Sequence, residues 1–99
     1  MRPLFPDAHA LASLCGRRHI RRLSLFGSTL KGAAGPDSDV DLLVEFAPHA
    51  KPGLLAMSEI ELELSSLLNG RKVDLRTAED LSRHFRDEVL RMVEVQYAA

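Results

Sequence analysis

The spacing of apolar residues along the chain predicts helices that alternate with short strands. Helical spacing and capping signals predict four helices, one of them short and directly after a glycine, over residues 8–18, 28–34, 54–69 and 79–93. The last of these is expected to break near residues 83–84. Short apolar runs predict three strands, over residues 21–26, 39–46 and 71–76. Residues 95–99 are too short to assign.

The lengths of the connections indicate how the strands pair. The segment between the first two strands is short for a parallel crossover, whereas the helix over 54–69 is long enough to permit one before the third strand. The sequence therefore predicts an α/β (α+β) fold, with a small mixed sheet of three to four strands packed with helices.

The helix over 54–69 carries the longest apolar stripe. Its face toward the core is expected to contain Met57, Ile60, Leu64, Leu67 and Leu68. We expect Leu55 and Leu62 to widen this stripe. Glu59 and Glu63 share a face of the same helix, and we expect a solvated surface there.

The composition narrows the class of protein. The chain has 99 residues, of which 45% are hydrophobic and 27% charged, which predicts a single globular domain over 1–99. The net charge of −1 makes direct DNA binding an unexpected role, and the basic run over 17–22 is not a recognition helix. The first residues lack the long apolar stretch of a signal peptide, and no apolar run is long enough to span a membrane. The single cysteine, Cys15, is expected in the core and fits a reducing, cytoplasmic setting.

Gly27 and Ser28 form the junction between the first strand and the short helix. The first turn of a helix carries free N–H groups and the positive end of the helix dipole, which suit a phosphate. On these two residues alone, an ordinary turn glycine followed by a capping serine is the better interpretation.

Three aspartates lie within the apolar strands, Asp39 and Asp41 in the second and Asp74 in the third. Side chains two apart on a strand point the same way, so Asp39 and Asp41 would repel each other unless a cation holds them. Asp74 can join them if the third strand lies beside the second. A divalent ion, Mg²⁺ or alternatively Mn²⁺, suits such carboxylates. The competing interpretation is that all three carboxylates face water at strand ends.

The sequence Gly27-Ser28, then ten residues, then Asp39-Val40-Asp41 resembles the signature of the DNA polymerase β-type nucleotidyltransferase superfamily. The short chain is similar to the minimal nucleotidyltransferases, which often accompany HEPN-domain toxins in prokaryotes. The resemblance runs from the strand at Leu23 through KVDLRT to the VLRMVEV tail. It implies the nucleotidyltransferase fold.

The resemblance also implies a role for each site residue. Gly27 and Ser28 would hold the β- and γ-phosphates of the nucleotide. Many members carry arginine directly after this pair, where this chain has Thr29. Lys31 is the candidate for a substitute phosphate-binding cation, and a solvent-exposed Lys31 is the alternative.

Asp39 and Asp41 would bind the metal ions. Asp74 would be a third metal ligand that also helps to deprotonate the acceptor hydroxyl. The implied reaction is Mg²⁺-dependent transfer of a nucleoside monophosphate, AMP from ATP, to a hydroxyl. The implied acceptor is a tyrosine of a HEPN-type toxin, which makes this chain an antitoxin. The alternative is a weakly active or inactive module that neutralises a toxin by complex formation.

Overall fold

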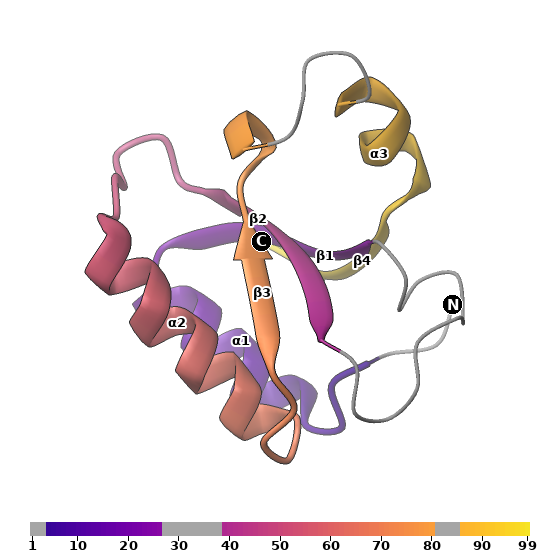
Figure 1. Cartoon of the computed structure of the whole chain (residues 1–99). Helices are drawn as coiled ribbons and strands as arrows, with labels where there is room; N and C mark the ends of the chain where they lie inside the picture. The colour runs from indigo at the N-terminus through magenta and orange to yellow at the C-terminus, as the bar shows by residue number, and fades with distance from the viewer. Residues whose placement is uncertain (1–3, 27–38, 81–85) are drawn as a thin grey trace.

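The computed structural model describes residues 4–26, 39–80 and 86–99. Its helices and strands, in chain order, are α1 (Ala8–Arg17), β1 (Ile20–Phe26), β2 (Val40–Phe46), α2 (Leu54–Leu67), β3 (Val73–Arg76), the short 3₁₀ helix η1 (Ala78–Asp80), α3 (Arg86–Met92) and β4 (Glu94–Ala98). Helices α1 and α2 lie side by side on one face of the sheet, and α3 lies on the other side (Figure 1). No helix within the described ranges has the length and apolar content needed to cross a membrane.

The described strands form one mixed sheet in the order β3-β2-β1-β4. Strand β1 pairs antiparallel with β2 and with β4, and β2 pairs parallel with β3. Helix α2 makes the crossover between the two parallel strands, as the connection lengths predicted. The mixed α/β fold is therefore confirmed, and β4 is the fourth strand that the sequence left unassigned.

The ends of the elements show where the sequence predictions were right and where they were wrong. Asp7 caps α1, because its Oδ1 accepts a hydrogen bond from the Ala10 N–H at 3.0 Å. Helix α2 ends at Leu67, two residues before the predicted end. The predicted helical tail over 79–93 contains α3, but its start is wrong, because Ala78–Asp80 form the 3₁₀ helix η1. The predicted helix over 28–34 and the break at 83–84 lie outside the described residues.

The core lies between α1, α2 and one face of the sheet. Its buried members include Leu14, Leu23, Leu42, Ile60 and Leu64. Leu55 and Leu62 do not widen the apolar face of α2, because these residues are 77% and 72% exposed. With about 3.6 residues per turn, positions five before and two after Ile60 point away from it, so these leucines lie on the outer side of the helix.

Cys15 is a core residue, as expected, with no exposed surface. Burial raises the pKa of its thiol from 9.0 to about 11, because the charged thiolate would be desolvated there. The thiol therefore stays protonated at neutral pH and has a packing role.

Glu63 connects α2 to the end of α1 and is less solvated than expected. Its Oε1 accepts a hydrogen bond from Arg18 Nε at 2.8 Å, and its Oε2 lies 3.5 Å from Arg17 Nη1. Glu59, on the same face, lies 3.6 Å from Arg18 Nη1. The hydrogen bond from Arg18 lowers the pKa of Glu63 and raises that of Arg18. This network holds the two helices together on the face of the sheet.

The Glu63→Gln variant is expected to lose stability only where Glu63 is ionised. The pKa of Glu63 in the folded chain is below its ordinary value of 4.5. Its ionised form therefore stabilises the fold above that pH, and the stabilisation disappears as the pH falls through the lowered pKa. Because the pair is partly exposed, we expect a loss of about 0.5–1 kcal/mol at pH 7 and a smaller loss at pH 3. Urea unfolding of both proteins at the two pH values measures this, and an equal loss at both would contradict it.

Candidate active site

The parallel pairing of β2 with β3 places Asp41 directly opposite Asp74. Neighbouring strands are about 4.8 Å apart, and residues in register point to the same face of the sheet. The third strand therefore does lie beside the second, which was the condition for Asp74 to join the other acids. Both side chains are half-buried, so their charges are close together and only partly screened by water.

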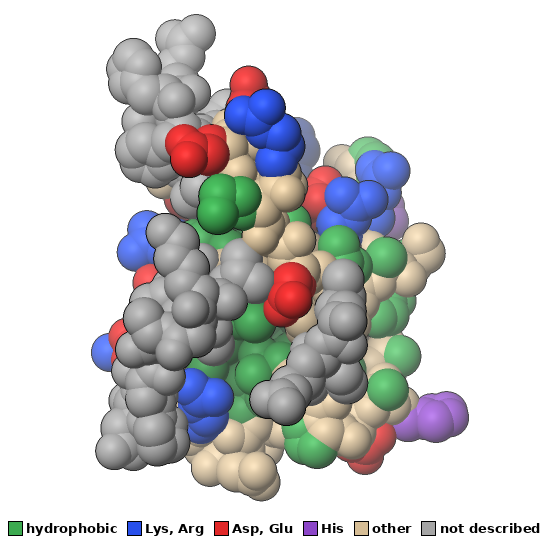
Figure 2. Space-filling view, turned by 90° about the vertical axis from the view of Figure 1, so that its right-hand side faces the viewer, with side chains coloured by type: hydrophobic (Ala, Val, Ile, Leu, Met, Phe, Trp, Pro, Cys, Tyr) green, Lys and Arg blue, Asp and Glu red, His purple; other side chains and the backbone are tan. Residues whose placement is uncertain are grey.

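The residues next to this pair on the same face of the sheet are buried. Leu43 and Ser24 are partners in the β1–β2 register, and they are 2% and 1% exposed. Leu43 lies two residues after Asp41 and thus on the same face of β2. Figure 2 shows acidic side chains beside hydrophobic ones on the face that lies to the right in Figure 1. Carboxylates next to buried residues attract a bound cation more strongly than carboxylates in open water do.

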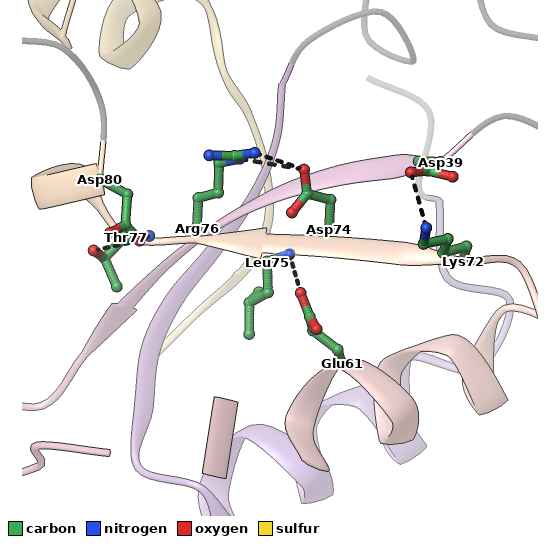
Figure 3. Close-up of polar contacts among 8 residues, drawn as sticks. All are labelled: Asp39, Glu61, Lys72, Asp74, Leu75, Arg76, Thr77 and Asp80. Carbon is green, nitrogen blue, oxygen red and sulfur yellow. Dashed lines mark hydrogen bonds and ion pairs between the residues drawn. The ribbon is translucent and has the colours of Figure 1, made fainter. Parts of the chain in front are cut away.

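Asp39 lies one residue before β2 and is more exposed than the other two. Its Oδ2 is 3.8 Å from Lys72 Nζ, and the Val40 N–H donates to the Lys72 carbonyl at 2.8 Å (Figure 3). The starts of β2 and β3 are therefore joined both by backbone and by an ion pair.

Asp74 is held by Arg76, two residues further along β3 (Figure 3). Arg76 Nε and Nη2 donate to the same oxygen, Asp74 Oδ2, at 3.2 and 3.1 Å. We did not expect this arginine from the sequence. The signal was present, because Lys72, Asp74 and Arg76 alternate along one strand and must therefore share a face.

Strand β3 is at the edge of the sheet, and two side chains fix it there. Glu61 of α2 accepts a hydrogen bond from the Leu75 N–H through Oε2 at 2.8 Å. Asp80 Oδ2 accepts from the Thr77 N–H and hydroxyl at 2.9 and 3.1 Å, which closes the turn into η1. An edge strand has backbone groups without a strand partner, so Glu61 supplies what a further strand would have supplied. These contacts hold the backbone that directly follows Asp74.

Removing the acceptor at position 61 should loosen β3. We expect Glu61→Ala to lower the free energy of unfolding by about 1–2 kcal/mol, because it leaves the Leu75 N–H without its partner. Glu61→Gln keeps an acceptor oxygen and should lose less than half as much. Amide hydrogen exchange at Leu75 gives a local check, and protection equal to that of the original chain in the alanine variant would contradict the role of Glu61.

A divalent metal ion is compatible with these acids, although the described residues do not form a complete site. No three His, Cys, Asp or Glu side chains among them are gathered closely enough to hold a metal ion. The Asp41–Asp74 pair nevertheless supplies hard oxygen donors from one row of the sheet. Mg²⁺ characteristically takes one or two carboxylates and completes its shell with water and substrate phosphates. The donor set therefore fits such an ion.

The predicted phosphate-binding residues Gly27, Ser28 and Lys31 lie outside the described residues, as does Thr29. Phe26, the last described residue before them, is the β1 partner of Asp41. The chain thus enters the predicted phosphate loop next to the acid pair.

A separate open pocket lies at the opposite end of β1. Its described lining includes Arg17, Arg18, His19 and Lys51 above Ile60, and it contains no carboxylate. It is therefore distinct from the aspartate site and offers no oxygen ligands of the kind discussed above.

Residues 10–96 match the nucleotidyltransferase domain family. The protein adenylyltransferase MntA of Thermococcus cleftensis is 42% identical over 74 residues, which are 75% of this chain and 72% of that protein.

Solved structures give a consistent result. A protein assigned as a minimal nucleotidyltransferase superposes with a TM-score of 0.68 at 39% identity, over 89% of this chain and 85% of the other. The tri-AMPylated HEPN toxin of Shewanella oneidensis in complex with its MNT antitoxin contains a chain with a TM-score of 0.62. The identity there is 20%, over 93% of this chain and 70% of the other, so this likeness is one of fold.

Proposed function

This chain belongs to the nucleotidyltransferase domain family, and we propose that it transfers AMP from ATP to a hydroxyl group in a Mg²⁺-dependent reaction. The observation that carries the proposal is the register that places Asp41 opposite Asp74. Two carboxylates side by side on neighbouring strands, next to buried residues, are the arrangement that divalent-ion chemistry on a phosphate needs.

Each site residue has a part in the proposed reaction. Asp39 and Asp41 would hold the divalent ions, whose chemistry is to neutralise the charge that develops on the phosphates. Asp74 would share in this and accept the proton of the attacking hydroxyl. The acceptor oxygen forms a bond to the α-phosphorus while the bond to the β-phosphate oxygen breaks, and pyrophosphate leaves. Gly27, Ser28 and Lys31 would bind the β- and γ-phosphates.

We propose that the acceptor is a tyrosine of a HEPN-type toxin, so that the chain acts as an antitoxin. The support comes from its relatives. One is named a protein adenylyltransferase, and a protein of the same fold was solved with an AMPylated HEPN toxin. The acceptor protein would then bring its own docking surface to the site.

A radiolabel experiment tests the acceptor. The purified chain, Mg²⁺ and α-labelled ATP are mixed with a purified HEPN-type toxin. We expect label on a tyrosine of that protein, located by peptide mass spectrometry. Label found only on the nucleotidyltransferase chain, or on neither protein, would contradict the proposed acceptor.

The second candidate is a module that neutralises its toxin by binding alone. Thr29 favours this candidate. Many members of the family have arginine at this position, and threonine lacks the positive charge with which arginine would bind a phosphate. An Asp41→Asn chain separates the two. If transfer is the function, this variant binds the toxin but leaves it active; if binding suffices, the variant still neutralises it.

A further inference from the structure

Two cations flank Asp74, Lys72 directly before β3 and Arg76 at the end of the strand. Lys72, Asp74 and Arg76 occupy alternate positions, and each cation lies against an acid of the site (Figure 3). Lys72 Nζ is 3.8 Å from Asp39 Oδ2, and Arg76 Nη2 is 3.1 Å from Asp74 Oδ2. Of the two, the contact made by Arg76 is shorter and uses two donors.

The guanidinium of Arg76 occupies one oxygen of the carboxylate that the proposed reaction requires. Both of its contacts go to Oδ2 of Asp74. A cation that approaches this carboxylate must compete with Arg76 or accept a position beside its positive charge. Either way, like charge opposes the binding of a metal ion.

The contact can nevertheless be broken, because it lies near the surface. The Arg76 and Asp74 side chains are 48% and 34% exposed, and ion pairs so placed contribute little to stability. The backbone here is fixed by the contacts of Leu75 with Glu61 and of Thr77 with Asp80. A change of partner by Arg76 therefore needs only rotation of its side chain.

We propose that Arg76 couples metal binding to nucleotide binding. Without nucleotide, its guanidinium holds Asp74 and opposes a divalent ion. When a nucleoside triphosphate is present, the phosphates offer the guanidinium an anionic partner that it can contact bidentately, which frees the Asp74 oxygen. The inference rests on the proposed function, since it assumes that Asp74 is a metal ligand.

This coupling can be measured as the effect of each ligand on the affinity for the other. If nucleotide strengthens metal binding, metal must strengthen nucleotide binding by the same factor. Arg76→Gln removes the competing charge and also the phosphate contact. The variant should therefore bind metal more tightly in the absence of nucleotide and show a smaller mutual strengthening.

The test uses the full chain with Mn²⁺ alone and with a non-hydrolysable ATP analogue. Electron paramagnetic resonance of free Mn²⁺ gives the metal Kd, and calorimetry gives the Kd of the analogue in EDTA and in saturating Mn²⁺. We expect Arg76→Gln to bind Mn²⁺ alone about fivefold more tightly than the original chain. The ratio of the two analogue Kd values should shrink several-fold. Arg76→Lys, which keeps a charge without the planar fork, should fall between the two.

Arg22→Gln is the matched control. Arg22 pairs with Glu45 at 3.5 Å, and those side chains are 51% and 39% exposed, close to the Arg76–Asp74 pair. It should leave both quantities unchanged. Thermal melting followed by circular dichroism confirms that each variant is folded.

The outcomes separate the two proposals. If the original chain binds Mn²⁺ and Asp41→Asn does not, but Arg76→Gln matches the original in both quantities, the coupling role of Arg76 is refuted and the proposed function stands. If Mn²⁺ binds neither alone nor with the analogue, or binds equally to Asp41→Asn, both proposals are refuted.

Discussion

The Asp41→Asn and Asp74→Asn variants are each expected to lower the rate of nucleotidyl transfer by about 10³-fold or more, which corresponds to about 4 kcal/mol in activation free energy. Asparagine keeps the size of the side chain but not its charge, so the site loses an anionic oxygen that a divalent ion needs. The two side chains face each other across β2 and β3, and neither change should disturb the core. Removal of one charge relieves the repulsion between the two acids, and for Asp74→Asn it also weakens the exposed pair with Arg76, so the melting temperature should change little.

The control for these variants is Glu45→Gln, in the same strand as Asp41. Glu45 is 39% exposed and pairs with Arg22, away from the Asp41–Asp74 row. Its transfer rate should stay within about twofold of the original, as for most surface substitutions. Initial rates with α-labelled ATP measure all three variants. An Asp41→Asn chain that keeps more than a tenth of the rate would refute the metal-site assignment.

The largest loss of stability is expected from Leu64→Ala in α2. Leu64 is completely buried between α2 and the sheet, so truncation leaves a cavity and should lower the free energy of unfolding by about 2–5 kcal/mol. Because α2 also supplies Glu61 to β3, we expect the transfer rate to fall at temperatures where the variant begins to melt.

The same substitution two residues earlier is the control. Leu62 is 72% exposed, and Leu62→Ala should change the free energy of unfolding by no more than about 0.5 kcal/mol. Denaturation in urea compares both variants with the original chain. Equal losses at positions 62 and 64 would contradict the orientation of α2 on the sheet.

Those parts of the fold that depend on local pattern were predictable from the sequence. The apolar runs located β1, β2 and β3, and the connection lengths gave the mixed sheet. Strand β4 was not assigned, although its polar and apolar residues alternate, because the run is short and its partner β1 lies far away in the sequence. The buried face of α2 is narrower than predicted. The apolar residues of a helix do not show how much of its surface the neighbouring sheet covers. Leu55 and Leu62 are therefore exposed.

The candidate site was predictable only in part, for a similar reason. Alternation along a strand placed Asp39 and Asp41 on one face, and the pairing of β2 with β3 then brought Asp74 beside them. The hydrogen bonds of Arg76 and Glu61 depend on side-chain rotamers and on which backbone groups an edge strand leaves free, and no sequence pattern specifies these. The roles of the three aspartates remain predictions for the experiments above.

The most direct test of the central claim asks which phosphate of ATP reaches the acceptor. The chain is incubated with the partner protein and Mg²⁺, in parallel reactions with α-labelled and with γ-labelled ATP. Transfer of AMP predicts that the α label appears on the acceptor, with one pyrophosphate released for each AMP transferred. Among the products, the γ label should appear only in pyrophosphate, and neither label should reach the acceptor with Asp41→Asn. Appearance of the γ label on the acceptor, or equal α labelling by Asp41→Asn, would contradict the account.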